Sequence, residues 1–369
     1  MKIESVALHL IELPLVHPFR TSFGVQRKRP CILVELRSEG VTGWGECVAG
    51  AAPLYSAETV ETAWHVLSQF LVPALLGQEI TEPAGIAPLY KQVRGHPMAK
   101  ASLENAVWDL LAKAQGVPLS ALLGGTRNRV EVGVSIGIQP TLAELLERVD
   151  SFVAAGYGRI KMKIEPGWLL EPISRVRERH PRIRLMADAN SAFTLEDAPL
   201  LKQLDSFDLL MIEQPLGYDD IADHARLQAQ LKTPICLDES IHSPADAQAM
   251  IDLQAGRIIN MKVGRVGGFT NALTIHDMAQ AAGIPLWCGG MLETGIGRAA
   301  NVHLASLPNF QLPGDISATD RYYHEDIAEP PFVLNPEDST ITVPAGPGIG
   351  VEVKRDRVAR ARQRHLVLP

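Results

Sequence analysis

The sequence predicts an α/β fold built around a modified TIM barrel of the type (β/α)7β, with an α+β capping domain. Short apolar strand-like runs alternate with amphipathic helical stretches from about residue 130 to residue 315, as in a parallel barrel. The first 50 residues or so alternate like an antiparallel sheet, and the C-terminal part is again rich in strand-like, Pro and Gly segments. We therefore expect a capping domain over residues 1–127, the barrel over 128–320, and a C-terminal segment, 321–369, that returns to the capping domain.

In the N-terminal part, the periodicity changes from that of strands to that of helices. Residues 2–13 and 30–35 are strand-like, and VTGWGECV at 41–48 has the glycines of a hairpin. Apolar residues at helical spacing then predict helices at about 57–73 and 97–115.

The break at Gly124-Gly125 introduces the barrel, for which eight strands and seven intervening helices are predicted. No GxGxxG motif follows an early strand, and the regular period favours a closed barrel over the competing open, doubly wound sheet. The predicted strands are 130–136, 158–164, 183–188, 208–213, 234–238, 257–262, 284–290 and 310–315.

The composition is that of an ordinary globular protein, with 369 residues, a formal net charge of −7 and a hydrophobic content of 46%. No apolar run reaches the roughly 18–20 residues of a membrane helix, and the N-terminus is typical of a strand rather than a signal peptide. Mild acidity without a basic patch argues against nucleic acid or a membrane as partner, and the basic stretch 355–364 is interpreted as a solvated helix face. We expect a cytoplasmic protein with four buried free thiols, at Cys31, Cys47, Cys236 and Cys288.

Five charged residues each end a predicted strand, at steps of 24 or 25 residues. Alone, an Asp in such a place is usually a helix N-cap and a Lys is usually solvated. Five in register on consecutive strands make that account improbable, because charges at the ends of apolar strands are costly unless they are paired or bind a metal. We expect them at one level of the C-terminal barrel mouth, where such barrels carry their active sites. They are Lys163, Asp188, Glu213, Asp238 and Lys262.

Three converging carboxylates without His or Cys predict a hard cation that prefers oxygen ligands. Asp188, Glu213 and Asp238 come from the third to fifth strands, so that Mg²⁺ is expected in preference to zinc, with Mn²⁺ or another divalent cation as a substitute.

The two terminal lysines predict proton transfer on both faces of a substrate. Lys163 and Lys262 lie on the second and sixth strands, which are opposite each other in a ring of eight. One lysine would remove the α-proton of a metal-bound carboxylate substrate, and the other would return it to the opposite face. A lysine with a pKa of about 10.4 is a poor base at neutral pH, so this pKa must be lowered. We expect a lowered pKa at Lys163, because Lys161 lies on the same face of the strand and its positive charge disfavours protonation of Lys163. Lys161 and Asn190 could also donate to the substrate carboxylate; the alternative role of Asn190 is in a turn.

With these residues identified, the chain resembles the enolase superfamily, and within it the muconate-lactonizing subgroup. The N-terminal part, including ENAVWDLLAKAQGVPLSALLGG at 104–125, resembles the capping domain of this family, so that the resemblance covers the whole chain. It implies enolate chemistry with Mg²⁺, a small-molecule carboxylate substrate and a homo-oligomer. The motifs are KxK at Lys161 and Lys163, DxN at Asp188 and Asn190, Glu213 in IEQP, the pair Asp238-Glu239, and Lys262 on the sixth strand.

Three further segments are similar to the branch of o-succinylbenzoate synthases and N-succinylamino acid racemases: SIG at 135–137, KVGRVGG at 262–268 and GGMLETGIGRAAN at 289–301. The resemblance implies a substrate pocket between barrel and cap, closed by cap loops. The implied substrate-binding residues are Ser135, Asn190, Met291 and Glu293 of the barrel, and Phe19, Phe23 and Tyr55 of the cap.

Some of these residues have alternative roles. Phe19 and Phe23 could instead pack on the barrel rim. Arg265 is expected to orient a base or a substrate tail, unless it forms a surface salt bridge. The glycine-rich stretch 289–297 is a weaker candidate for a phosphate cradle.

The predicted function is abstraction of the proton α to a carboxylate, leading to N-acyl (N-succinyl) amino acid racemization, to o-succinylbenzoate synthesis by dehydration, or to both. Muconate-type cycloisomerization and dipeptide epimerization are alternatives. A dipeptide ammonium would need acidic residues near the eighth strand, where Asp315 is instead interpreted as a turn or cap residue. The non-enzymatic alternative is a catalytically silent barrel acting as a binding protein, in which the unpaired charges would destabilise the barrel mouth.

Overall fold

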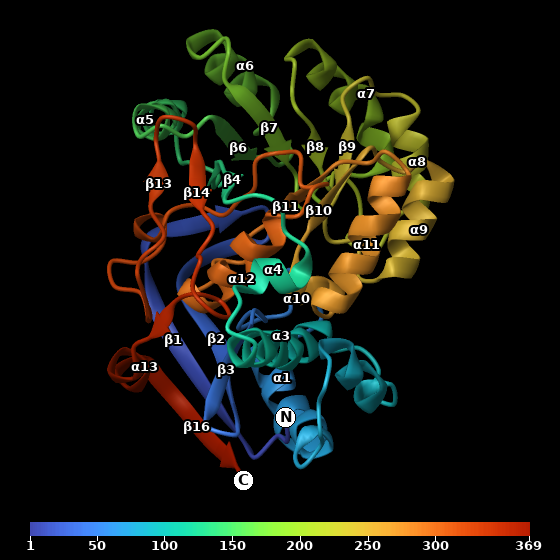
Figure 1. The fold of residues 1–369 in the computed structure, drawn as a ribbon. Helices are drawn as coiled ribbons and strands as arrows, with labels where there is room; N and C mark the ends of the chain where they lie inside the picture. The colour runs from blue at the N-terminus through green and yellow to red at the C-terminus, as the bar shows by residue number, and fades with distance from the viewer.

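Two sheets of different kinds organise the chain: an antiparallel sheet in the cap and a parallel sheet in the barrel (Figure 1). The computed structural model describes all residues, 1–369. The cap sheet has the strand order β16-β1-β2-β3, so that the last strand of the chain lies beside the first. Its strands are β1 (Ser5–Thr21), β2 (Gly24–Ser38), β3 (Val41–Cys47) and β16 (Arg362–Leu368).

The hairpin of β1 and β2 is longer than predicted and reaches the barrel mouth. Its turn lies at Thr21–Gly24, and a register shift between Pro14 and Phe19 interrupts the pairing. Near the tip, the backbone carbonyl of Arg20 accepts a hydrogen bond from the N–H of Ile138 at 3.0 Å. The cap sheet therefore extends one loop directly over the strand ends of the barrel.

Helix α3 (Pro97–Ala114), predicted at 97–115, packs closely on β3. Glycines permit this approach: a Cβ on Gly45 would lie 2.0 Å from the carbonyl oxygen of Ser102. The helix predicted at 57–73 spans 60–75 and contains one π-helical turn, and it starts with a capping box at Thr59. The other cap elements are α1 (Val60–Val66), η1 (Leu67–Leu71), α2 (Val72–Leu75), η2 (Pro83–Tyr90) and α4 (Leu119–Leu123).

Seven of the eight predicted barrel strands form one parallel sheet, in the order β11-β10-β9-β8-β7-β6-β5. The eighth predicted strand, 310–315, forms only single parallel bridges, from Phe310 to Leu286 and from Gly314 to Val132, and these bridges close the ring. Pro313 has no N–H to donate to a longer ladder. The strands are β5 (Val134–Ile136), β6 (Arg159–Lys163), β7 (Arg184–Asp188), β8 (Ile212–Glu213), β9 (Ile235–Leu237), β10 (Ile258–Met261) and β11 (Leu286–Cys288).

Helices cover the outside of this sheet, and a separate cluster of side chains fills its interior. In α5, for example, Leu145 and Val149 are one turn apart and both are buried against the barrel. The interior cluster consists of Met186, Met211, Cys236, Ile258 and Trp287. The helices are α5 (Leu142–Ala154), α6 (Leu170–Arg179), η3 (Leu195–Asp197), α7 (Ala198–Leu201), η4 (Lys202–Ser206), α8 (Ala222–Gln228), α9 (Pro244–Leu253), α10 (Val263–Val266), α11 (Phe269–Ala281) and α12 (Gly295–Ala305).

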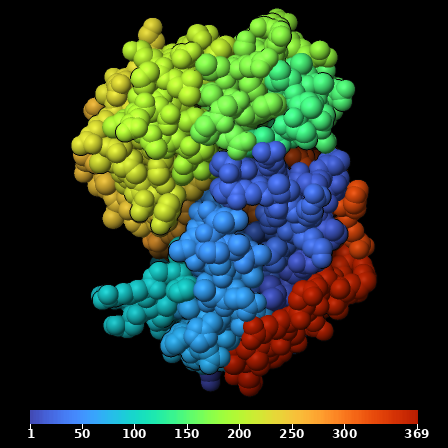
Figure 2. Space-filling view, turned by 180° about the vertical axis from the view of Figure 1, so that it is seen from behind, coloured from blue at the N-terminus to red at the C-terminus, as the bar shows by residue number.

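The C-terminal segment connects the barrel with the cap. Strand β14 pairs with β4 at the start of the barrel, and β16 pairs with β1 along the cap, where Figure 2 shows the red segment bordering the blue one. The interpretation of 355–364 as one helix face is wrong, because the helix ends at Ala361 and the stretch continues in β16. The elements are β4 (Arg129–Glu131), η5 (Thr319–Arg321), β12 (Ala328–Glu329), β13 (Leu334–Asn335), β14 (Thr340–Thr342), β15 (Glu352–Val353) and α13 (Arg355–Ala361).

All four cysteines are free and buried, as expected. No helix combines the length and the apolar composition required to cross a bilayer.

Candidate active site

A cavity of about 350 Å³ lies between the barrel mouth and the cap. The cap contributes the hairpin tip and the loop around Tyr55, and the barrel contributes strand ends and the loop after β11. Among the predicted site residues, those that line the cavity are Phe19, Phe23, Tyr55, Ser135, Lys161, Lys163, Asn190, Lys262 and Met291.

The register of the barrel strands brings the charged strand ends together. Lys163 is the direct neighbour of Asp188 across β6 and β7, and Asp188 is the direct neighbour of Glu213 across β7 and β8. Asp238 and Lys262 follow immediately after β9 and β10. All five side chains are buried, so their charges act on one another with little screening by water.

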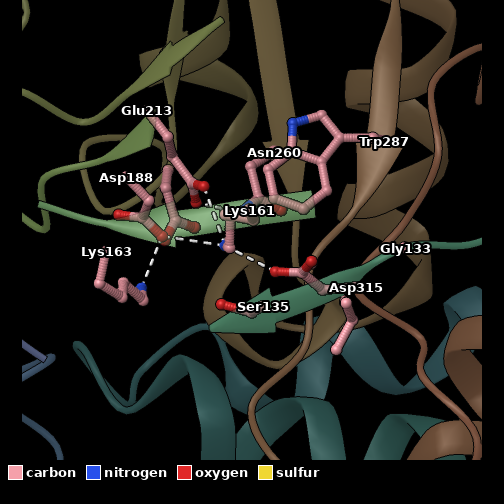
Figure 3. Close-up of polar contacts among 12 residues, drawn as sticks. Gly133, Ser135, Lys161, Lys163, Asp188, Glu213, Asn260, Trp287 and Asp315 are labelled. Carbon is pink, nitrogen blue, oxygen red and sulfur yellow. Dashed lines mark hydrogen bonds and ion pairs between the residues drawn. The ribbon is translucent and has the colours of Figure 1, made fainter. Parts of the chain in front are cut away.

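Lys161 lies at the centre of this group (Figure 3). Its Nζ is 2.9 Å from Asp188 Oδ2, 2.9 Å from Glu213 Oε2 and 2.6 Å from Asp315 Oδ2. Burial opposes the positive charge, but these carboxylates outweigh it and raise the pKa of Lys161 well above its usual value. The Nζ also lies 4.9 Å from the centre of the Trp287 ring. Lys161 is therefore held as an ammonium ion between opposite sides of the barrel.

The interpretation of Asp315 as a turn or cap residue is wrong. Its buried carboxylate also pairs with Arg159 at 2.6 Å. Burial opposes ionisation, yet the two cations lower the pKa of Asp315 to about 2. Asp315 is thus a counter-ion of Lys161 and Arg159.

On one side of the cavity, Lys163 is held by an acid and an amide. Its Nζ lies 2.5 Å from Asp188 Oδ2 and donates to Asn190 Oδ1 at 2.5 Å. Asn190 has a positive φ of 42°, as in a turn, and its side-chain nitrogen donates to Glu239 Oε1 at 2.9 Å. Burial and the negative charge of Asp238 raise the pKa of Glu239 to about 8, and its Oε2 has no hydrogen-bond partner.

The other lysine, Lys262, lies beneath the cap. Its Nζ contacts Asp238 Oδ2 at 2.8 Å and donates to the hydroxyl oxygen of Tyr55 at 3.0 Å. Burial disfavours its charge, but Asp238 and Tyr55 outweigh this and raise the pKa of Lys262. As its direct counter-ion, Asp238 therefore favours the charged form of Lys262.

Arg265 does not form a surface salt bridge. It is buried and donates to Asp238 Oδ1, to the Tyr55 hydroxyl and to the carbonyl oxygens of Ile241 and Asn260. It supports the carboxylate that Lys262 also contacts.

Some residues of the site were missed in the sequence, among them Asn260 and Trp287. Asn260 donates from Nδ2 to Glu213 Oε1 at 2.7 Å, and Trp287 donates from Nε1 to the sulfur of Cys236 at 3.2 Å. Strand alternation was the available signal for Asn260, because it lies two residues before Lys262 and so shares its inward face. The role of Trp287 had no comparable signal, because an inward aromatic residue is ordinary in a barrel core.

Glu293 does not line the cavity. Its carboxylate accepts hydrogen bonds from the N–H of Met291 at 2.8 Å and from Asn301 Nδ2 at 2.9 Å, so that it shapes the loop that carries Met291. The backbone N–H groups of Thr294 and Gly297 are bound by the Glu46 carboxylate. These bonds occupy the donors that the suggested phosphate cradle would need.

The carboxylates Asp188, Glu213 and Asp238 fit a hard divalent cation in chemical type, because they are buried oxygen donors on three adjacent strand ends. Burial, together with the charge of Asp188, raises the pKa of Glu213 well above its usual value, which reflects concentrated negative charge. Each carboxylate is paired with a cationic side chain, and no three acidic, His or Cys side chains converge closely enough to hold a metal as placed. A bound ion would therefore displace the lysine ammonium groups from these oxygens.

Comparison with known proteins agrees with this architecture. The mandelate racemase/muconate lactonizing enzyme N-terminal domain matches residues 5–124, and the enolase C-terminal domain-like family matches 144–357. An o-succinylbenzoate synthase of Geobacillus kaustophilus is 52% identical over 364 residues, covering 98% of this chain and 96% of that protein. An N-succinylamino acid racemase of Thermus thermophilus is 50% identical over 360 residues, covering 98% and 97%. The crystal structure of an enolase superfamily protein from Listeria innocua superposes with a TM-score of 0.96 at 42% identity, covering 100% and 99% of the two chains. The chain therefore belongs to the enolase superfamily.

Proposed function

We propose that this protein removes the proton α to the carboxylate of an N-succinylamino acid and returns it to either face, and that the same site can dehydrate a precursor to o-succinylbenzoate. The observation that carries the proposal is the placement of Lys163 and Lys262. They come from β6 and from the end of β10, line one cavity and flank the carboxylate group.

In this proposal each lysine serves one face of the α-carbon. For racemization, one lysine accepts the proton as a free amine and the other donates a proton as an ammonium ion, so that the two exchange roles with the substrate enantiomer. For dehydration, one lysine accepts the α-proton and then gives it to the departing hydroxyl, which leaves as water, while the opposite ammonium ion stabilises the negative intermediate. Lys161, held by Asp315 and Glu213, keeps its charge and can donate to the substrate carboxylate.

We propose that Asp188, Glu213 and Asp238 hold Mg²⁺ or another divalent cation. Such an ion would neutralise the carboxylates that now bind the lysines and would polarise the substrate carboxylate. Arg265 would keep Asp238 in position through its contact with Oδ1.

Dipeptide epimerization is less compatible with the site. The ammonium of a dipeptide needs a free carboxylate near the eighth strand, whereas Asp315 is already neutralised by Arg159 and Lys161. The similarity to synthases and racemases at about half identity likewise favours them over muconate-type cycloisomerization.

Proton NMR in D₂O tests the proposal directly. A single enantiomer of an N-succinylamino acid is incubated with enzyme and Mg²⁺, while the α-proton signal and the optical rotation are followed together. We expect both to disappear. Exchange with retained rotation would indicate one active base and favour the synthase reaction, and no exchange on any N-acylamino acid would refute the racemase assignment.

The metal assignment has a separate test. Mg²⁺ should raise the melting temperature of the wild-type protein, because binding to the native state stabilises it. Asp238→Asn should weaken this Mg²⁺ dependence. An unchanged dependence in the variant would remove Asp238 from the set of ligands.

A further inference from the structure

Arg29 is a buried cation that lines the cavity and lacks a carboxylate partner. It lies on β2, is 3% exposed and borders the same cavity as Lys163 and Lys262. Its side chain makes one hydrogen bond, from Nη2 to the carbonyl oxygen of Val48 at 2.6 Å. Its Nε is buried and has no partner. A buried guanidinium ion in this state is unfavourable until a further acceptor reaches it.

The other buried cations that line this cavity are satisfied. Lys161, Lys163 and Lys262 each contact carboxylates at distances between 2.5 and 2.9 Å. Lys28, which also borders the cavity, is exposed and pairs with Glu12 at 2.7 Å. Arg29 is therefore the buried cation of the cavity with donors left for a ligand.

The buried carboxylate of Glu46 does not fill this role. It forms no ion pair with Arg29 and instead accepts hydrogen bonds from Thr294 and Gly297. Burial raises the pKa of Glu46 to about 7, even though the charge of Arg29 acts in the opposite direction. The free donors of Arg29 thus have no acceptor within the protein.

We propose that Arg29 binds the terminal carboxylate of the succinyl arm, and that it thereby selects substrates with a second carboxylate. This inference rests on the proposed function, in which Lys163 and Lys262 act beside the first carboxylate. N-succinylamino acids and o-succinylbenzoate share the succinyl arm, so one receptor serves both reactions. The planar guanidinium matches a carboxylate better than an ammonium ion does, because it donates in a fixed fork.

A matched pair of substrates tests the role of Arg29. An N-succinylamino acid is compared with the N-succinamoyl derivative of the same amino acid, in which a neutral amide replaces the terminal carboxylate. The wild-type enzyme should prefer the succinyl compound by roughly 10- to 100-fold in kcat/KM, since charged hydrogen bonds are of that strength. Arg29→Met should reduce the preference to about threefold or less, mainly through a higher KM for the succinyl compound.

Lys28→Met is the control variant. It removes a charge from the neighbouring residue, but that charge is exposed and paired with Glu12, so the substrate preference should remain. A loss of preference as large as in Arg29→Met would show that general electrostatic attraction, and not Arg29, recognises the arm.

The outcomes separate the two proposals. If the wild type turns over both substrates equally, or if Arg29→Met keeps the full preference, the Arg29 assignment is overturned while the racemase function stands. If the wild type exchanges the α-proton of neither substrate, the proposed function itself fails. Should Arg29→Met not fold, Arg29→Lys takes its place, because it keeps the charge but not the fork: a clear loss of preference supports the assignment, and an unchanged preference overturns it.

Discussion

The hydroxyl of Tyr55 connects the cap to one of the two proposed bases, and Tyr55→Phe should disable that base selectively. The hydroxyl oxygen accepts hydrogen bonds from Lys262 Nζ at 3.0 Å and from Arg265 Nη1 at 3.3 Å, and it donates to Asp238 Oδ1 at 3.2 Å. Phenylalanine keeps the ring, whose centre is 4.4 Å from Lys262 Nζ, and removes only the hydroxyl. Lys163, held by Asp188 and Asn190, loses no contact.

The size of the effect follows from the contact that is lost. One hydrogen bond to a charged group stabilises by about 1.5–3 kcal/mol, which corresponds to roughly 10- to 100-fold in rate if the bond positions the base. The assay for this prediction is the initial rate of α-proton exchange in D₂O, followed separately for each enantiomer of an N-succinylamino acid. Exchange of the enantiomer served by Lys262 should fall by this factor. Racemization should fall equally, because it needs both lysines, whereas exchange of the other enantiomer should change by less than about threefold.

The control is Tyr90→Phe, which removes a hydroxyl that is buried in the cap and has no hydrogen-bond partner. It should leave both exchange rates unchanged. Equal loss of exchange for both enantiomers in Tyr55→Phe would refute the reasoning, because the hydroxyl would then act through Asp238 or through closure of the cap. Unchanged rates for both enantiomers would refute it as well.

Three further predictions concern the bases, the pH dependence of stability and the cap. Lys163→Ala and Lys262→Ala should each lower racemization by roughly 10²- to 10⁴-fold, while each retains exchange of one enantiomer; loss of both exchanges in either variant would contradict the two-base mechanism. Burial raises the pKa of the Glu58 carboxyl from 4.5 to about 7. Between these pH values the native state holds a proton that the unfolded state has released. The free energy of unfolding should therefore fall by about 3 kcal/mol as the pH rises from 4.5 to about 7. Urea unfolding at several pH values should show this slope in the wild type and a shallower one in Glu58→Gln, and equal slopes would contradict it. Gly45→Ala should destabilise the protein by about 1–3 kcal/mol in urea unfolding, because its Cβ would lie 2.0 Å from a carbonyl oxygen of α3. Gly85→Ala is the control: its Cβ would lie 3.9 Å from Glu82 Cγ, so its stability should stay within about 0.5 kcal/mol of the wild type.

The strand-end charges could be predicted because the barrel repeats. Each βα unit from Lys163 to Lys262 has nearly the same length, so that equal spacing in the sequence becomes equal height in the sheet. The prediction of a parallel barrel, confirmed by the structure, depends on the same repetition.

Contacts between distant segments could not be predicted in this way. Asp315 reaches Lys161 and Arg159 only because the closed ring brings together residues that lie more than 150 positions apart in the sequence. The local sequence LPGD resembles a turn, and nothing near it indicates an ion pair. Likewise, the burial of Arg265 depends on the cap residue Tyr55, which is 210 positions away.

The position of β16 has a consequence for the order in which the protein can assemble. The long strand β1 (Ser5–Thr21) precedes the whole barrel in the sequence, yet one of its edges is covered only by β16 (Arg362–Leu368), which follows the barrel. Without β16 that edge offers unpaired N–H and C=O groups, which are a template for pairing with other chains. A nascent or truncated chain without residues 362–369 should therefore associate through β1, although it contains every residue of the proposed active site. Protection of the β1 edge therefore depends on a segment that lies beyond the barrel in the sequence.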